Sequence, residues 1–268
     1  QRLIRSAAMP VRQSLIAAFL LVMPVGVPGA AEPLPEGLVE EFQARYPELS
    51  EGSPPRIEPI SPRVIHHGSR SHGQVALTFD ACSHHDRNEV NEQVLDILRD
   101  RDIPATLFLG GLWMAEHPEL TRDLHKDARF EVGTHAWGHP DLTKLSPREV
   151  EQQIGLAQLM AHALTGKWPR HFRAPYVAID ETVWHTAGAL GVRTVQYDVA
   201  SGDAEASADP EQVAEYVLDR VDDGSIVVLH LHDPELPTAE ALPGILDGLQ
   251  ERGLEPVRME QLRGQGPS

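Results

Sequence analysis

From Gln74 onward, apolar runs and amphipathic stretches follow one another regularly along the chain. Short apolar runs, each about as long as a buried strand, are separated by amphipathic stretches of helical period. The runs fall at 74–80, 105–111, 130–136, 171–175, 193–199, 225–231 and 255–259. Strands that alternate with helices in this order predict repeated β/α units and a parallel sheet of about seven strands.

Two helices can be placed by their first residues. The segment Ser146–Glu149 has the form of a capping box with proline at its second position, and Asp209–Gln212 repeats the pattern. In each, the side-chain oxygen of the first residue can accept hydrogen bonds from backbone N–H groups that the helix leaves unpaired. The helix after Ser146 is expected to end at Gly166, because glycine tolerates the left-handed conformation that closes a helix.

The first 31 residues have the pattern of a secretory signal peptide. Arg12 is followed by an apolar run at 15–23 and then by small residues at 29–31. We therefore expect cleavage after position 31, with residues 1–8 as an upstream extension. The apolar run is shorter than the ~20 residues that a membrane span needs, so no stable span is expected. The alternative is an uncleaved interfacial anchor.

The rest of the chain divides where the regular pattern begins. Residues 32–73 are rich in Pro, Glu and Ser and are expected to form a lead-in or linker segment, followed by one α/β domain at 74–263. Export would place the protein in the periplasm or outside the cell. A monomer is expected.

The charge balance argues against one class of partner. The chain carries 23 Lys and Arg against 40 Asp and Glu, a formal net charge of -17. A surface of this kind repels polyanions at ordinary salt. Nucleic acid is therefore not an expected partner.

Cys82 is the only cysteine, so no intrachain disulfide can stabilise the fold of an exported protein. Its thiol could be a nucleophile. The position directly after a predicted strand favours the other interpretation, a small and half-buried packing residue.

Polar residues that can carry chemistry gather at the carboxyl ends of the predicted strands. They are Asp80, His135, His139, Arg173, Asp198 and His230. In a parallel β/α barrel these ends meet at one rim, where ligands bind. Taken singly, each has an ordinary alternative: a chance histidine pair among 14 histidines, a helix cap, a surface cation or a core histidine. Their coincidence at one rim favours a shared site.

The motifs around these residues resemble the polysaccharide deacetylase family, also called carbohydrate esterase family four or the nodulation-deacetylase homology domain. The resemblance covers about residues 74–262. It rests on five motifs in order, namely Thr78-Phe79-Asp80, the H-x-x-x-H segment from His135 to His139, Arg173-Ala174-Pro175-Tyr176, the strand with Asp198, and Leu229-His230. It implies a distorted, incomplete (β/α) barrel and a metal-dependent hydrolase that removes acetyl groups from a glycan.

The resemblance also implies the acid and base of that reaction. Asp80 would be the general base, oriented by Arg173, and its pKa would be lowered by that cation. His230 would protonate the leaving nitrogen, and Asp198 would favour its charged form. The Pro175-Tyr176 segment would offer the Tyr176 backbone N–H as an oxyanion donor.

The implied metal site departs from the family at one position. His135 and His139 would hold a divalent metal, with zinc expected and cobalt or nickel as alternatives. The family usually places a second aspartate, a metal ligand, where this chain has Ala81. A methyl group cannot coordinate a metal, so the third ligand stays open between water and the nearby His84, His85 and Asp86.

The expected substrate is an acetylated polysaccharide or oligosaccharide, such as peptidoglycan, a chitin-like oligomer or an exopolysaccharide. Removal of O-acetyl groups is an alternative to removal of N-acetyl groups. A carbohydrate-binding pseudoenzyme that has lost its metal site with the change to Ala81 is the alternative from another class. Retention of Asp80, Arg173 and His230 argues against it, because a binding module needs no acid–base pair.

Overall fold

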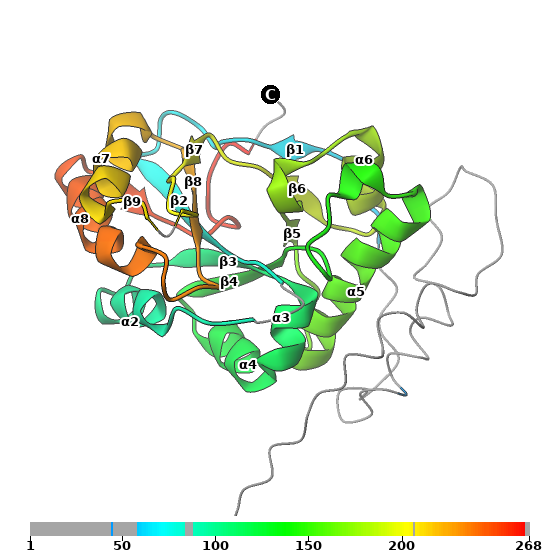
Figure 1. Cartoon of the computed structure of the whole chain (residues 1–268). Coiled ribbons are helices and arrows are strands. Elements are labelled where there is room, and N and C mark those ends of the chain that lie inside the picture. The colour runs from blue at the N-terminus through cyan, green and yellow to red at the C-terminus, as the bar shows by residue number, and fades with distance from the viewer. Residues whose placement is uncertain (1–43, 45–57, 84–87, 206, 266–268) are drawn as a thin grey trace, which may run out of the picture. The chain divides into compact units, whose positions relative to one another are not determined.

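The computed structural model describes residues 44, 58–83, 88–205 and 207–265, and Figure 1 shows a parallel sheet with helices around it. The strand order along the sheet is β1-β6-β5-β4-β3-β2-β8-β7, and β9 pairs with β2 beside this path. The strands are β1 (Val64–Ile65), β2 (Gln74–Ala81), β3 (Ala105–Leu109), β4 (Phe130–Thr134), β5 (His171–Phe172), β6 (Arg193–Val195), β7 (Val199–Ala200), β8 (Ile226–His230) and β9 (Glu255–Pro256).

Every strand pair in the described residues is parallel. The sheet curls into an open, incomplete (β/α) barrel, which confirms the expected fold class. Parallel strands need long crossover connections, and here helices provide most of them. The carboxyl ends of the strands consequently share one rim.

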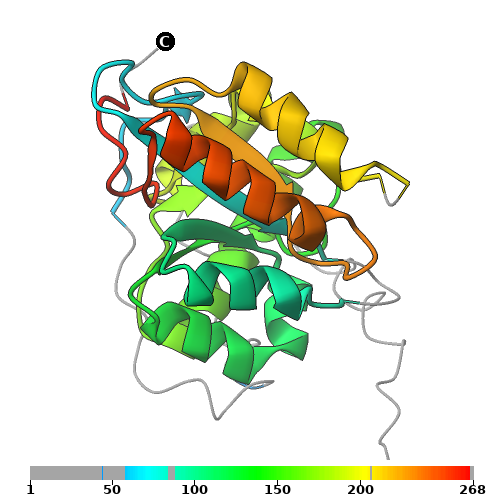
Figure 2. The same ribbon diagram turned by 90° about the vertical axis from the view of Figure 1, so that its left-hand side faces the viewer.

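The helices pack in neighbouring pairs around the sheet. Figure 2 shows α7 and α8 side by side along β8 and β2, while α5 packs against α3, α4 and α6. The helices are α2 (Glu92–Asp100), α3 (Gly111–Glu116), α4 (Pro118–Lys126), α5 (Pro147–Thr165), α6 (Glu181–Ala189), α7 (Pro210–Arg220) and α8 (Thr238–Glu251), with short 3-10 turns η4 (Leu142–Lys144) and η5 (Pro175–Val177).

The alternation of side chains along β2 separates the helix-facing core from the barrel interior. Val75, Leu77, Phe79 and Ala81 all belong to the main hydrophobic cluster with the surrounding helices. The intervening residues face the other way, since successive side chains of a strand point to opposite faces. Asp80 is among these interior residues, so its carboxylate is held inside the barrel near the rim.

Each predicted strand coincides with an observed one, but the segment 193–199 is not continuous. Its first residues form β6, which pairs with β5 and β1, whereas Val199 begins β7, which pairs with β8 at the other end of the strand order. The sheet also includes β1 from the segment predicted as a lead-in. Both extra strands have two residues, too few for a periodic pattern to appear in the sequence.

Both predicted helix starts are confirmed. The Ser146 side chain and Glu149 form the reciprocal capping box, and Gly166 closes α5 with a φ of 72°. The Asp209 side chain accepts a hydrogen bond from the Gln212 N–H. The predicted signal peptide lies outside the described residues. Among the residues that are described, no helix has both the length and the apolar character for a membrane crossing.

Candidate active site

Four strands, β2, β4, β5 and β8, bring the motif residues to one rim. Asp80 of β2 is in register with His230 of β8. His135 and Arg173 each directly follow a pair of aligned residues, Thr134 of β4 and Phe172 of β5. Polar groups that are up to 150 positions apart in the sequence therefore meet at the carboxyl ends of the strands between β5 and β8 in the strand order.

Asp80 and Arg173 form a buried ion pair. The Arg173 guanidinium donates from Nη1 to Asp80 Oδ1 at 2.8 Å and to Thr78 Oγ1 at 2.8 Å. Burial by itself would raise the pKa of Asp80, but the charge of Arg173, the nearby histidines and the Arg173 hydrogen bond together outweigh it, and the pKa is lowered. Asp80 is therefore an ionised carboxylate at neutral pH, as a general base requires.

The surroundings of Arg173 make this pair rigid. The side chain is 1% exposed, its Nη2 donates to the Gln196 carbonyl at 3.3 Å, and the guanidinium carbon lies 4.3 Å from the centre of the Phe108 ring. A buried charge is tolerated when it is paired and hydrogen-bonded. Arg173 thus has few alternatives to the orientation in which it holds Asp80.

His230 is paired with Asp203. The two groups meet at 2.7 Å between His230 Nδ1 and Asp203 Oδ1, and the His230 backbone N–H donates to Asp203 Oδ2 at 2.8 Å. Burial lowers the pKa of His230, but the hydrogen bond and charge of Asp203 more than offset it, so the pKa is raised. With its Nδ1 hydrogen held by Asp203, the imidazole has Nε2 available for proton transfer.

Asp203 takes the place that was expected for Asp198. The Asp198 carboxylate instead accepts from Arg70, from Ser225 and from the backbone N–H of Ile226, at distances of 2.7, 2.9 and 2.7 Å. Ile226 begins β8, so Asp198 lies at the amino end of the strand whose carboxyl end carries His230. The expected pairing of Asp198 with His230 is corrected accordingly.

The break between β6 and β7 explains this correction. Because β7 starts at Val199, the carboxyl end of this part of the sheet comes after Ala200 and not near Asp198. Ser201 and Gly202 make the following turn, where Gly202 has a φ of 80°. Asp203 then reaches back to the rim. A Ser-Gly-Asp sequence directly after an apolar pair was the available signal.

Cys82, His135 and His139 form a cluster of potential metal ligands. One ligand atom from each lies within 4.8 Å of the others, and within the described residues this is the one such cluster of three. His135 donates its Nδ1 hydrogen to the Arg173 carbonyl at 2.9 Å. Its Nε2 therefore presents a lone pair, 3.7 Å from Cys82 Sγ and 3.9 Å from Asp80 Oδ2.

The residues present fit a bound divalent cation. Burial lowers the pKa of His135, so a neutral imidazole lone pair and an ionised carboxylate oxygen face each other in the barrel interior. Two acceptors in this arrangement repel unless a cation lies between or beside them. Imidazole nitrogen and sulfur are the donors that zinc prefers. The proposed alternatives His84, His85 and Asp86 lie outside the described residues.

Backbone strain gathers beside this cluster. Ala136 and His139 have φ values of 58° and 60°, and Tyr176 and Val177 follow with 57° and 59°. Residues other than glycine seldom adopt this left-handed conformation, and when they do it is often at functional sites. The Tyr176 side chain is 67% exposed, and its ring meets the His139 ring edge-on at 4.6 Å between centroids.

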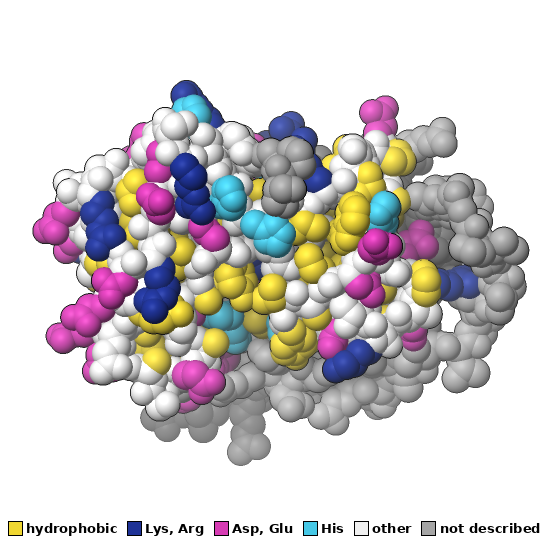
Figure 3. Space-filling model, turned by 90° about the horizontal axis from the view of Figure 1, so that it is seen from above, with side chains coloured by type: hydrophobic (Ala, Val, Ile, Leu, Met, Phe, Trp, Pro, Cys, Tyr) yellow, Lys and Arg dark blue, Asp and Glu magenta, His cyan; other side chains and the backbone are white. Residues whose placement is uncertain are grey.

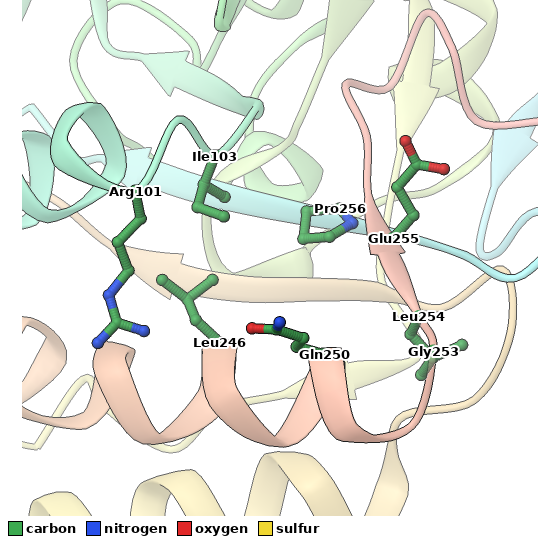
Figure 4. Close-up of a pocket in the computed structure, with 8 residues that line it drawn as sticks. All are labelled: Arg101, Ile103, Leu246, Gln250, Gly253, Leu254, Glu255 and Pro256. Carbon is green, nitrogen blue, oxygen red and sulfur yellow. The ribbon is translucent and has the colours of Figure 1, made fainter.

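A hollow of about 660 Å³ lies elsewhere, between α8, β9 and the residues that follow α2. Figure 4 shows its lining, in which Leu246 and Gln250 of α8 face Ile103 and Pro256. None of the motif residues lines it. On the face seen in Figure 3, acidic and basic side chains are interspersed, with no broad basic surface of the kind that binds polyanions.

Sequence comparison finds relatives with named activities. The family model described as Polysaccharide deacetylase matches residues 67–195. A peptidoglycan-N-acetylglucosamine deacetylase of Listeria monocytogenes is 31% identical over 91% of this chain, which spans 49% of that relative's length. A chitooligosaccharide deacetylase of Azorhizobium caulinodans is 31% identical over 70% of this chain and 95% of its own length.

Solved structures share the fold. A peptidoglycan N-acetylglucosamine deacetylase is similar with a TM-score of 0.70 at 24% identity, over 75% of this chain and 93% of its own. A CE4 family pseudoenzyme from Bacillus anthracis is similar with a TM-score of 0.69 at 25% identity, over 85% of this chain and 83% of its own. Motifs, fold and relatives agree that this chain belongs to the polysaccharide deacetylase family.

Proposed function

We propose that the protein is a metal-dependent hydrolase that removes N-acetyl groups from a polysaccharide. The observation that carries this proposal is the placement of a carboxylate held ionised by Arg173 and an imidazole held by Asp203 on one rim, with His135 and His139 beside them. Hydrolysis of an acetamide needs a base for water, an acid for the leaving nitrogen and a stabilised oxyanion.

Asp80 acts as the general base. Its Oδ2 is directed toward the metal-ligand cluster, 3.9 Å from His135 Nε2, while Oδ1 is occupied by Arg173. A zinc ion held by His135 and His139 would polarise the acetyl carbonyl and lower the pKa of a bound water. Arg173 keeps the carboxylate both ionised and correctly turned to accept a proton from that water.

His230 acts as the general acid. Asp203 holds the Nδ1 side of the ring, so Nε2 is the atom that delivers a proton to the departing sugar nitrogen. Asp203 is 0% exposed and also accepts from the hydroxyl groups of Ser201 and Thr238. These bonds fix the carboxylate, and through it the orientation and charged form of the imidazole.

The Pro175-Tyr176 segment completes the proposed site. Pro175 is buried and starts the η5 turn, and Tyr176 has the left-handed backbone conformation described above. We assign the Tyr176 backbone N–H as a donor to the oxyanion, a role suited to a turn whose conformation is fixed before substrate binds. The exposed ring of Tyr176 lies where a sugar could contact it.

The substrate class follows from the named relatives. Peptidoglycan and chitin-like oligosaccharides both present acetamido groups, and the Listeria and Azorhizobium proteins are named for them. Both polymers are met outside the cytoplasm, which agrees with the signal peptide expected at residues 1–31. An exported deacetylase acting on a wall or extracellular glycan is the resulting proposal, and O-acetyl groups are a second possible target of the same chemistry.

Acetate release tests the activity. Purified protein loaded with zinc is expected to release acetate from N-acetylated glycan oligomers, and Asp80→Asn is expected to reduce the rate by about 10²-fold or more. A parallel screen with peptidoglycan fragments, chitin oligomers and acetylated xylan would identify the substrate. Equal rates for the wild type and Asp80→Asn would reject the mechanism.

The second candidate is a carbohydrate-binding pseudoenzyme. It is favoured by the alanine at position 81 and by the similarity to a pseudoenzyme structure, a mutant of which is described as having restored activity. The same samples distinguish the two candidates. Tight glycan binding with neither metal nor acetate release would favour the pseudoenzyme.

A further inference from the structure

We propose that the Cys82 thiolate is the third protein ligand of the metal, replacing the carboxylate that position 81 lacks. This inference rests on the proposed metal-dependent function. It goes beyond that function because a Cys-His-His site differs in metal preference from a site with a carboxylate ligand.

The strand geometry explains why position 82 and not position 81 supplies the ligand. Ala81 is 0% exposed and packs in the helix-facing cluster. Cys82 follows Asp80 by two residues, so the extended backbone returns its side chain to the interior side. The contact between Cys82 Sγ and His135 Nε2 shows that it does.

The spacing of the donor atoms suits one ion. Zinc binds sulfur at about 2.3 Å and nitrogen at about 2.0–2.1 Å, so two tetrahedral ligands lie about 3.5 Å apart. Cys82 Sγ and His135 Nε2 are 3.7 Å apart, and His139 completes a group within 4.8 Å. Only a small inward movement of His139 is needed to close the triad.

The hydrogen bond on the far side of His135 supports the assignment. Metal-bound histidine usually donates its other ring N–H to a carbonyl or carboxylate, which fixes the ring and its tautomer. The Arg173 carbonyl has this role for His135 at 2.9 Å. The ring is therefore oriented toward Cys82 before any metal binds.

A purely structural role accounts less well for Cys82. The residue is 5% exposed, as a packing cysteine would be, but its sulfur is turned toward an imidazole and not into the helix-facing cluster. The His135 Nε2 that this sulfur faces lies 3.9 Å from Asp80 Oδ2, so the thiol borders a group of hydrogen-bond acceptors. A buried thiol among acceptors gains from a cation that it can bind.

Thiolate ligation would set the metal preference. Sulfur donors favour zinc and other late first-row ions over magnesium, calcium and manganese, which prefer oxygen. We therefore expect the protein to retain zinc or cobalt(II) through gel filtration and to retain neither magnesium nor calcium.

Cobalt substitution provides a direct readout that does not depend on activity. The cobalt(II)-loaded full chain is expected to show an intense near-ultraviolet sulfur-to-cobalt charge-transfer band. Cys82→Ser and Cys82→Asp should both lose the band. Zinc binding to Cys82→Ser should weaken by about 100-fold or more, because mutation of a residue that only supports a ligand already reduces metal affinity by about 10–100-fold. His85→Ala and Asp86→Asn are the matched controls and should keep the band.

The outcomes separate this inference from the proposed function. A wild-type spectrum without the band, or a band unchanged in Cys82→Ser, would overturn thiolate ligation even if acetate is released. A charge-transfer band without acetate release would support the ligand and count against the activity. Circular dichroism checks the fold of each variant, and if Cys82→Ser does not fold, the wild-type and Cys82→Asp spectra still decide.

Discussion

Two histidine–carboxylate pairs lie at opposite ends of the sheet. His230 and Asp203 meet at the carboxyl rim at 2.7 Å, and His171 and Glu131 meet at 2.5 Å near the amino ends of β5 and β4. Their local chemistry is nearly the same. Their surroundings differ, because His230 neighbours Asp80 across the sheet while Glu131 is bound to the Glu260 backbone N–H and to Thr106.

The comparison shows that a short histidine–carboxylate hydrogen bond is not by itself evidence of catalysis. The His230 side chain is 19% exposed and His171 only 1%, so only the first can meet a substrate. Strand direction decides the difference, because in β/α barrels the functional rim lies at the carboxyl ends of the strands, and the amino ends serve stability. We assign His230 to the reaction and His171 to the fold.

Single substitutions of His230 and of His171 should give the largest difference in activity between the two pairs. His230→Gln is expected to reduce kcat by about 10²–10⁴-fold, the usual contribution of a positioned acid. His171→Gln should leave kcat essentially unchanged, because its ring lies at the other end of the strands. Acetate release at equal metal content is the measurement, and similar losses in both variants would contradict the assignment.

Substitutions of the two carboxylate partners, Asp203 and Glu131, should differ in their effect on the pH dependence of kcat. Burial lowers the pKa of His230, but Asp203 raises it overall, so the acid stays protonated to a higher pH than an ordinary histidine. Asp203→Asn removes the raising charge, and the alkaline limb of kcat should move to lower pH. Glu131→Gln should not move it. A limb that stays in place in Asp203→Asn would show that another group is the acid.

Glu131→Gln should instead lower the free energy of unfolding. This is the smallest effect expected among the three tests. Burial raises the pKa of Glu131, but the hydrogen bond and charge of His171, together with the hydrogen bonds from Glu260 and Thr106, outweigh this and the pKa is lowered. A lowered folded-state pKa contributes stability above the ordinary glutamate pKa and loses it as pH falls through the lowered value. Near neutral pH the variant should be less stable by about 1–3 kcal/mol.

Urea unfolding at neutral and acidic pH measures this effect. The difference between wild type and Glu131→Gln should shrink as the pH is lowered, because the wild type loses the contribution of its ionised carboxylate. A difference that is constant with pH would mean that packing around Glu131, and not its charge, stabilises the pair.

The sequence was sufficient to predict the long elements and the position of most residues of the candidate site. The β2 segment has eight residues, seven of them buried, and such runs are visible as apolar patterns. Ordered motifs placed Asp80, His135, His139, Arg173 and His230 on one rim. Capping residues marked α5 and α7 because their side chains act on the adjacent backbone, which is a local effect.

The partner of His230, Asp203, and the contact of Cys82 with His135 were not predicted, because both depend on three-dimensional contacts. The two-residue β7 pairs with a strand nearly thirty positions later, and a pattern that short cannot indicate where a strand ends. In the sequence, Cys82 has the position of a packing residue directly after a strand, and only its contact with His135 reveals the side it faces. The end of β7 and the side that Cys82 faces are determined by tertiary pairing and not by local propensity.

Arg173 contributes to the site through two different parts of the same residue. Its carbonyl oxygen fixes the ring of His135, and its guanidinium fixes the carboxylate of Asp80. A shift of the main chain at this one position would therefore misplace the proposed metal-binding imidazole and the proposed proton acceptor together.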